Sequence, residues 1–360
     1  MRSVYIHIPF CKSICSYCDF CKFLHNEEWA SKYLDVLKQE IDEYYENDPI
    51  KTIYIGGGTP SSLSIENINK LFSFFDKFKI IENPEITFEC NVNDITEELL
   101  KTLKKNNVTR LSIGVESFNK DKLRFMDRQH NKKDIISNIR LCKEYGFDNI
   151  NVDLIYALPE ETLHMLKKDV SCMLKLDVEH ISTYSLIIEE HTKIYNEKTE
   201  PIEDFMDYKM YKYICKKLKK KGYHHYEISN FAKDGYESKH NLTYWNNDEY
   251  YGFGLGSHGY INSMRYENTR NFNKYLKGEY RLNELLVSSQ EEMENELILG
   301  FRKLDGISIK KIYEKFNRDI FEVFKIEEAI KKGYIVKEGD ILYIPENKVY
   351  VMNEILNLIM

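Results

Sequence analysis

The chain has 360 residues, 42% of them hydrophobic, which is enough to bury the core of one large domain with a smaller domain attached. Its formal net charge of −7 argues against a general nucleic-acid-binding protein, and no apolar run approaches the roughly 18 to 20 residues of a membrane helix. The first ten residues are too few for the three regions of a signal peptide, so we expect a cytoplasmic protein without a transmembrane segment.

A first predicted strand, residues 2–8, leads directly into an unusual group of cysteines. The stretch FCKSICSYCDFC contains four of the chain's eight cysteines. In a reducing cytosol, clustered cysteines more often bind metal than form a structural set of disulfides. The spacing of Cys11, Cys15 and Cys18 crowds three thiols onto one loop, and no second CxxC pair follows. This pattern favours a [4Fe–4S] cluster with one open iron over structural zinc or unliganded thiols.

Five further runs are predicted to be strands because they are short, apolar and rich in β-branched residues: 51–56, 85–91, 109–115, 150–158 and 180–188. Apolar residues recur at helical spacing between them, beginning with a stripe from Trp29 to Tyr44. Ser64 is predicted to cap the next helix, and Asp94 with Glu97 to form a capping box before another. This alternation of strands and helices predicts a parallel sheet.

Polar residues gather where the predicted strands end, which is where barrel proteins carry their chemistry. The loop GGGTPSS places Gly57, Gly58 and Thr59 after the second strand, where glycines let the backbone approach a ligand and free N–H groups bind an anion. A simple tight turn is the alternative for this loop.

Charged residues follow at the ends of the next strands. A single charge there is usually a salt bridge or a helix cap, but a carboxylate inside an apolar strand is costly without a partner. The succession of charges therefore favours a bound ligand as their partner: Glu89, Glu116, Arg128 and Asp153.

The cysteine spacing, with aromatic Tyr17 just before the third cysteine, resembles the radical S-adenosylmethionine (SAM) superfamily. The resemblance implies an α/β fold, an open (β/α)6 partial TIM barrel of the radical SAM type. It also implies that Cys11, Cys15 and Cys18 are the metal ligands and that SAM binds the fourth iron of the cluster. Cys21 is then a spare thiol.

Longer phrases are similar to the HemN/HemW family: YIHIPFC, GGGTPSSL, LSIGVESFN, VDLIYALPEET, YEISNFAKDGYESKHNLTYWNN and YYGFGLGSHGY. The similarity runs from Tyr5 to the C-terminus and is closest to the HemW type, the heme chaperones. HemN, the oxygen-independent coproporphyrinogen III oxidase, carries an N-terminal extension before its cluster loop, and the four residues before Tyr5 in this sequence favour the HemW type. The chain's HNLTYW stretch matches the HNxxYW motif associated with heme binding in HemW.

This resemblance implies a set of cofactor-binding residues. The SAM contacts are Gly57, Gly58, Thr59, Glu89, Glu116, Arg128 and Asp153, with Tyr5 and His7 flanking the cluster loop. The heme contacts are His240, Tyr244 and Trp245, with His258 as a further candidate for either cofactor. For His240 the residues alone leave open a buried histidine that is merely hydrogen-bonded. The chain departs from the family at Glu116, usually glutamine, and at Ala157 and Glu160, which replace glycines of a GLPG turn.

Three segments are expected: a radical SAM partial barrel over 1–200, a HemN/HemW-type extension with the HNxxYW motif over 201–284, and a small winged-helix-like domain over 285–360. In the last, a helix is expected to end near Asp305 and Gly306, and a helix, turn and β-hairpin to follow. We expect this domain to form a lid over the barrel mouth or a docking surface.

The resemblance implies a heme chaperone that binds a [4Fe–4S] cluster, SAM and heme and transfers heme to an acceptor protein, such as a respiratory hemoprotein. An electron donor such as flavodoxin or ferredoxin is expected, and nucleic acid is not expected as a partner. The alternative is a coproporphyrinogen III oxidase-like oxidoreductase that cleaves SAM, and a third class is a structural zinc-loop protein.

Overall fold

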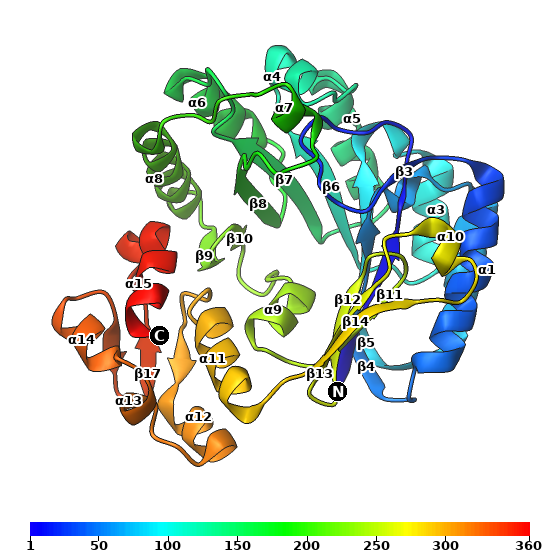
Figure 1. The fold of residues 1–360 in the computed structure, drawn as a ribbon. Helices are drawn as coiled ribbons and strands as arrows, with labels where there is room; N and C mark the ends of the chain where they lie inside the picture. The colour runs from blue at the N-terminus through cyan, green and yellow to red at the C-terminus, as the bar shows by residue number, and fades with distance from the viewer.

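A curved 12-stranded sheet forms the centre of the structure, a computed structural model that describes residues 1–360 (Figure 1). The six predicted strands are confirmed as parallel neighbours in chain order: β1 (Arg2–Ile8), β4 (Pro49–Gly57), β5 (Lys79–Asn91), β6 (Arg110–Glu116), β7 (Ile150–Tyr156) and β8 (His180–Ser185). The last two strands end earlier than predicted. The expected partial barrel is therefore present.

Further strands extend the sheet at both ends. On one side, β11 (Tyr250–Phe253) pairs parallel with β1, and β12 (His258–Ile261), β13 (Met264–Asn268) and β14 (Arg281–Leu286) continue antiparallel. On the other side, β10 (Asn230–Ala232) and β9 (His224–Glu227) follow β8. The sheet runs across residue 200, and the predicted division of the chain there stays a prediction.

Helices cover the outer face of the sheet (Figure 1). In chain order they are α1 (Glu27–Tyr44), α2 (Ile65–Phe72), α3 (Glu97–Lys105), α4 (Lys120–Phe125), α5 (Lys132–Glu144), α6 (Leu163–Met173) and α8 (Asp204–Lys220). The short α7 (Lys193–Asn196) instead lies beside the cysteine loop, where the Ile194 amide donates to the Ser16 carbonyl. The inner face is covered differently: α9 (Lys239–Trp245) lies in the opening between the two ends of the sheet (Figure 1). The strands are nearly continuously buried because helices cover the outer face and α9 covers part of the inner face.

Local signals predicted some helix boundaries and missed others. Ser64 caps α2 as predicted, accepting a bond from the Asn67 amide. The capping box at Asp94 is wrong, because α3 is capped by Thr96. Asp94 instead accepts bonds from Lys12 Nζ at 2.7 Å and Ser61 Oγ at 3.0 Å, so tertiary partners outside its own helix occupy its carboxylate. Trp29, predicted to join the buried stripe of α1, is 47% exposed.

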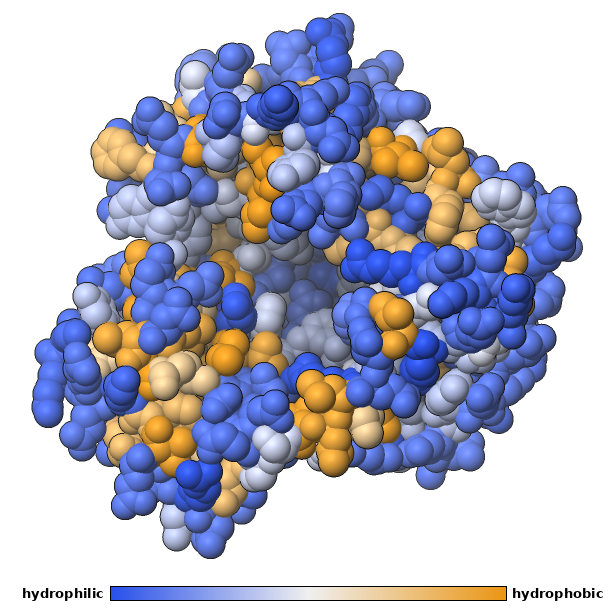
Figure 2. Space-filling model, viewed as in Figure 1, coloured by the Kyte–Doolittle hydropathy of each residue, from blue (hydrophilic) through white to orange (hydrophobic).

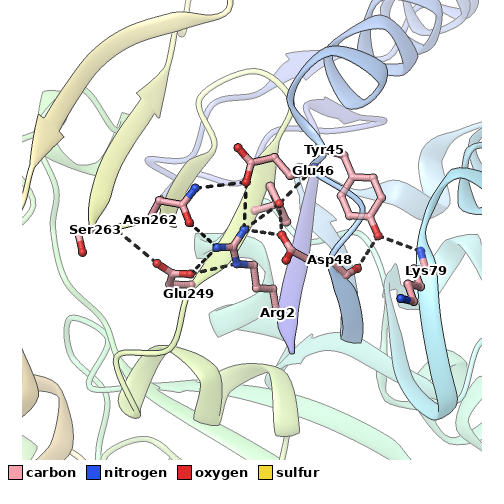
Figure 3. A network of polar contacts seen from close by, with 9 residues as sticks. Arg2, Tyr45, Glu46, Asp48, Lys79, Glu249, Asn262 and Ser263 are labelled. Atoms are coloured by element: carbon pink, nitrogen blue, oxygen red, sulfur yellow. Dashed lines mark hydrogen bonds and ion pairs between the residues drawn. The ribbon is translucent and has the colours of Figure 1, made fainter. Parts of the chain in front are cut away.

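Arg2 joins segments that are distant in sequence at the start of the parallel strands (Figure 3). Its guanidinium contacts Glu249 beside β11 at 2.8 Å, Asn262 beyond β12 at 2.6 Å, and Asp48 before β4. Tyr251 Oη accepts another of its hydrogen bonds at 3.0 Å. The nearby carboxylates and Tyr251 raise the pKa of Arg2 despite its partial burial. These contacts hold β1 between its two parallel neighbours, β4 and β11.

Glu40 of α1 performs a similar function within the core. Its carboxylate is fully buried and accepts hydrogen bonds from the Gly254 amide at 2.8 Å, Asn268 Nδ2 at 2.6 Å and Tyr275 Oη at 2.6 Å. A buried carboxylate with three donors is well compensated, because each bond replaces one lost to water. Glu40 therefore ties α1 to the β11–β13 region and to α10 (Phe272–Tyr275).

The last part of the chain has its own hydrophobic core of 17 buried residues between Met293 and Ile359. Its elements are α11 (Ser289–Gly300), α12 (Ile309–Phe316), α13 (Ile320–Val323), α14 (Ile326–Lys331), α15 (Met352–Ile359) and a sheet of β15 (Ile307–Ser308), β17 (Ile341–Tyr343) and β16 (Val336–Glu338). The predicted helix, turn and hairpin are confirmed. The first helix ends at Gly300, before the predicted Asp305–Gly306, and β15 then folds back so closely that a Cβ on Gly300 would lie 2.2 Å from Ile307.

The turn after β7 keeps a left-handed backbone even though its expected glycines are absent. Ala157 and Glu160 have φ angles of 61° and 59°. Side chains cost about 1–2 kcal/mol per residue in this region. The substitution of these glycines therefore leaves the turn geometry intact and introduces strain.

We expect Glu160→Gly to stabilise the protein by up to about 1 kcal/mol. The relief of about 1–2 kcal/mol of left-handed strain exceeds the roughly 0.5–1 kcal/mol of extra backbone entropy that glycine loses on folding. Glu160 is exposed, so no buried contact is lost. Chemical denaturation measures the change. The matched control is Gln39→Gly, an exposed position in the middle of α1, where glycine should destabilise by about 1 kcal/mol. Equal signs for both variants would contradict the assignment of strain.

Candidate functional site

A cavity of about 480 Å³ lies on the inner side of the sheet, below the cysteine loop and at the C-terminal ends of β4 to β8. The molecule is visibly hollowed at its centre in the space-filling view, where the inner face of the sheet lies (Figure 2). Ten of the predicted site residues line this cavity: Cys11, Cys15, Cys18, Gly57, Gly58, Thr59, Glu89, Glu116, Arg128 and Asp153. No residue of 285–360 lines it, so the last domain does not form a lid over this cavity.

The cysteine loop is held between two short strands, β2 (Phe10–Cys11) and β3 (Phe23–Leu24), which pair with each other. Thr59 Oγ1 donates to Cys11 Sγ at 3.4 Å, and Arg128 Nη1 donates to Cys15 Sγ at 3.4 Å. Burial raises the pKa of Cys11 to about 11, so a metal bound there must displace a proton. Three soft thiol donors on one loop suit an iron–sulfur cluster, although they are not closed around a common centre here.

Gly57 and Gly58 bring the backbone against its neighbours more closely than other residues could. Gly57 has a φ of 111°, and a Cβ on it would lie 2.4 Å from the His7 ring. The expectation of free N–H groups in this loop is wrong. The Gly57 amide donates to Glu89 Oε2 at 3.1 Å, and the amides of Gly58 and Thr59 donate to the carbonyls of Ile8 and Phe10. The glycines in this loop therefore allow its backbone to lie close to the His7 ring and to the chain after β1.

Glu89 lies at the end of β5 and faces the cavity. Its carboxylate accepts hydrogen bonds from Tyr54 Oη at 2.6 Å and the Gly57 amide. Burial raises the pKa of Glu89 to about 7, the repulsion of Asp153 adds to the shift, and the two donors oppose it. The group therefore changes charge near neutral pH.

Glu116 and Arg128 form an ion pair at 3.2 Å over the same cavity. Both side chains are about 10% exposed or less. Glu116 has a φ of 62°, and Arg128 Nη2 also donates to the Gly114 carbonyl, where a Cβ would lie 2.5 Å from Arg128. Strained backbone that is over-determined by its surroundings is typical of ligand sites.

Asp153 on β7 accepts a hydrogen bond from Asn151 Nδ2 at 2.9 Å, and burial raises its pKa. The cavity thus brings together three carboxyl groups, of which Glu116 is buried and Glu89 and Asp153 are half-buried, and the guanidinium groups of Arg110 and Arg128. This excess of acid suits a ligand with a positive centre, while the arginines suit a carboxylate at the other end of that ligand.

Arg110 is a site residue that sequence reasoning missed. It begins β6, is 2% exposed and has its Nε unpartnered. Its charge contributes to lowering the pKa of both His180 and His240. The available signal is a charge inside an apolar strand, the same signal that identifies Asp153, but Arg110 lies at the start of its strand, away from the strand ends where barrel proteins carry their chemistry. The other missed lining residues include Tyr54, Ser112, Asn151, Ser182 and Tyr184.

Tyr5 and His7 lie beside the loop but do not line the cavity. His7 Nε2 donates to the Cys21 carbonyl at 2.8 Å, which leaves Nδ1 to accept from Tyr5 Oη at 3.0 Å. Burial lowers the pKa of His7 to about 4, so the ring is neutral. The pair fixes the far end of the cysteine loop. Cys21 is separate from the cavity, 4.0 Å from the Arg270 carbonyl.

The HNLTYW stretch forms α9, and His240 within it is 1% exposed. Both ring nitrogens are engaged: Nδ1 with Thr52 Oγ1 at 2.8 Å and Nε2 with Tyr244 Oη at 2.9 Å. Burial lowers the pKa of His240 to about 3. Asn241, the next residue, lines the cavity, so α9 forms part of its wall.

Trp245 and His258 lie further from the cavity. The Trp245 ring lies 5.7 Å below the guanidinium carbon of Arg302, at the boundary with the last domain. His258 on β12 has an exposed side chain, with Nε2 3.9 Å from Glu267. The structure therefore does not bring the predicted heme residues together around one histidine nitrogen that could bind heme iron.

Comparisons with known proteins agree with this geometry. Residues 5–173 match the model of the radical SAM superfamily, and residues 287–347 match that of the HemN C-terminal domain. The chain is 39% identical to heme chaperone HemW of Bacillus subtilis, covering 99% of this chain and 98% of the relative. It is 39% identical to heme chaperone HemW of Lactococcus lactis over 94% and 91%, and 30% identical to that of Escherichia coli over 99% and 97%.

Among solved structures, the coproporphyrinogen III oxidase HemN of Escherichia coli, a radical SAM enzyme, is similar with a TM-score of 0.88. The likeness covers 99% of this chain and 89% of that one at 19% identity, and it supports the fold. None of the helices is both long and apolar enough to span a membrane.

We expect Glu89 to make the ligand-free protein less stable as pH rises from 5 to 8, against the opposite contribution of buried histidines such as His7 and His240, whose lowered pKa values make the folded state more stable as pH rises. The pKa of Glu89 in the folded protein, about 7, exceeds the ordinary 4.5. Its contribution to the free energy of unfolding is therefore present at low pH and is lost as pH rises through the folded-state pKa. Glu89→Gln should remove on the order of 3 kcal/mol of this dependence. Urea unfolding at both pH values in reducing buffer measures it. Glu82→Gln, at an exposed position, is the control, and an unchanged slope in Glu89→Gln would contradict the assignment.

Proposed function

The chain belongs to the HemW family of heme chaperones, within the radical SAM superfamily, and from this membership we propose that it holds a [4Fe–4S] cluster and SAM in the cavity and passes heme to an acceptor protein. The observation that carries the proposal is the convergence on one cavity. Three thiols from a single loop, three carboxyl groups and Arg128 meet there, although they come from separate parts of the chain.

Cys11, Cys15 and Cys18 are the proposed cluster ligands. Thr59 Oγ1 donates to Cys11 Sγ, which opposes the rise of the Cys11 pKa on burial, and Arg128 Nη1 donates to Cys15 Sγ. When bound, the cluster supplies an open iron and one-electron reducing power. Cys21 is left out because it lies outside the cavity, and its carbonyl, held by His7, fixes the loop instead.

The remaining lining residues fit the two charged ends of SAM. Arg128 can donate parallel hydrogen bonds to a carboxylate. Glu89, Glu116 and Asp153 face the cavity as acceptors for ribose hydroxyls and as counter-charges for a sulfonium. Glu116 places a third carboxylate where the family usually has a neutral glutamine, and it strengthens the attraction for the sulfonium when Arg128 engages the ligand carboxylate.

For heme, the HNxxYW motif supports His240 as an iron ligand, with Tyr244 and Trp245 against the macrocycle. In the observed conformation this requires Tyr244 to release His240 Nε2, because a neutral imidazole ligates iron through a free nitrogen. His258 remains a second proposed ligand, since its side chain is exposed. Tyr5 and His7 are proposed to support the cluster from behind.

A heme-accepting protein is the partner implied by a heme chaperone. We propose that a respiratory hemoprotein is one acceptor and that flavodoxin or ferredoxin reduces the cluster. All eight cysteines are free thiols, which suits a reducing compartment, so the cytoplasm is the proposed location.

Anaerobic reconstitution with iron and sulfide tests the cluster ligands. The wild type should bind about four irons per chain, and Cys15→Ser should lose most of them because the loop has no fourth thiol within the cavity. Cys21→Ser is the matched control and should retain the cluster. SAM should then change the electron paramagnetic resonance spectrum of the reduced cluster. A cluster that survives in Cys15→Ser, or a spectrum indifferent to SAM, would overturn the assignment.

Hemin titration tests the heme site. His240→Ala should weaken heme binding by about tenfold or more and shift the Soret band, because an axial ligand is lost. His180→Ala is the matched control: His180 is also fully buried and has both nitrogens bonded, to Asn151 at 2.6 Å and Tyr226 at 2.8 Å. Unchanged affinity in His240→Ala removes it from the site. Heme transfer to an apo-hemoprotein checks the chaperone function, whereas conversion of coproporphyrinogen III would indicate the oxidase.

A further inference from the structure

A buried ion cluster lies directly behind the cavity, around Lys122 near the start of α4. Its ammonium donates to Glu161 Oε1 at 2.6 Å, Asp169 Oδ2 at 2.9 Å and the Ile155 carbonyl at 3.2 Å. The three side chains are at most 2% exposed. An ammonium has three protons, and each has an acceptor, so the lysine is fully satisfied.

The two carboxylates bind loop backbone with their remaining oxygen lone pairs. Asp169, on α6, accepts bonds from Ser117 Oγ at 2.7 Å and the Phe118 amide at 2.9 Å. Glu161 accepts a bond from the Leu158 amide at 3.1 Å. The loop after β6 and the turn after β7 are thereby tied to the same ammonium.

Such a cluster is a poor way to gain stability, since apolar residues of similar volume often do as well or better. Its effect here is geometric. Glu116 immediately precedes Ser117, and Ile155, whose carbonyl Lys122 binds, lines the cavity. The cluster therefore fixes two walls of the site from behind.

The helix that carries Lys122 also holds the cysteine loop. The Ser16 amide donates to the Met126 carbonyl at 3.3 Å, and Ser16 Oγ donates to the Phe125 carbonyl at 2.7 Å. Tyr17 packs against a small apolar cluster formed by Leu123, Met126, Ile155 and Leu158. Ser16 and Tyr17 are the two residues between Cys15 and Cys18.

The chain leaving α4 leads to Arg128, which contacts both Cys15 Sγ and Glu116. One helix thus reaches the cluster loop through Ser16 and the Glu116 pair through Arg128. Each contact depends on where α4 lies, and Lys122 is the buried charge that anchors α4 to the strands below.

We propose that Lys122, with Glu161 and Asp169, is a positioning anchor that sets the Cys15–Cys18 segment and the Glu116–Arg128 pair together, so that the cluster site and the SAM site are built on one support. This inference rests on the proposed function for its ligands. The anchoring itself rests on the contacts of α4 alone. Loss of the anchor lowers the population of the binding-competent loop and weakens both sites in proportion.

Two variants test the anchor. Lys122→Met keeps the length of the side chain but leaves two buried carboxylates without their counter-charge. The neutral triple variant Lys122→Met, Glu161→Gln, Asp169→Asn keeps amide oxygens as acceptors for the loop backbone and avoids unpaired charge. The matched control is Glu40→Gln, which disturbs another fully buried charge, on α1, whose partners do not line the cavity.

Hydrogen–deuterium exchange of the ligand-free full chain gives the first measurement. Peptides covering 12–18 and 116–128 should exchange faster in both anchor variants and remain unchanged in Glu40→Gln. The second measurement is SAM affinity of the reconstituted protein, which should weaken by about tenfold in Lys122→Met if one loop in ten remains competent. The SAM-dependent spectral change should fall with it, whereas Glu40→Gln should alter only the melting temperature.

Wild-type exchange in these peptides in the triple variant would overturn the proposal, and this result is decisive even where Lys122→Met does not fold. Equal loss of protection in Glu40→Gln would also overturn it, because the effect would then be general destabilisation. If the wild type itself shows no response to SAM, the proposed function fails, and the exchange data still decide the anchoring separately.

Discussion

The compensation of buried charge inside the curved sheet is the interaction on which the rest of the structure depends. Glu89, Glu116 and Asp153 project from neighbouring parallel strands into one cavity, and Arg110 and Arg128 are the cations that make their burial tolerable. The raised pKa values of the carboxyl groups show that this compensation is incomplete in the ligand-free protein. A ligand that brings a positive centre completes it, so the chemistry of the site and the stability of the barrel have one electrostatic origin.

Around the cavity, charged residues join parts of the fold that are distant in sequence. Arg2 and Glu40 attach β11 to β14 to the first strands and α1, and the Lys122 cluster attaches the cysteine loop to the strand ends. The α9 helix enters the same interior, with Asn241 in the cavity wall and His240 bonded on both nitrogens. Because α9 belongs to the wall, any movement of this helix alters the cavity.

Departures from the family pattern lie in the site, at Glu116, and in the turn after β7, at Ala157 and Glu160. Ala157, Glu160 and Glu116 all hold left-handed backbone conformations. The turn at Leu158 is held by Glu161, and the residue after Glu116 by Asp169, so the buried cluster supports the strained positions directly. Strain persists where surrounding bonds over-determine the backbone. Here those bonds come from groups that also anchor α4.

By itself, the amino-acid sequence determined the parallel strands, the order of strand and helix, the cysteine loop and the carboxylates at strand ends, because each follows from periodicity and spacing along the chain. Tertiary structure decided everything that depends on partners distant in sequence. Asp94 pairs with Lys12 and does not cap a helix, and the amides of Gly57 to Thr59 donate hydrogen bonds within the protein. Arg110 lines the cavity, and both ring nitrogens of His240 are hydrogen-bonded. A buried polar group forms hydrogen bonds with whichever partner the fold brings within reach, and the local sequence does not predict that partner.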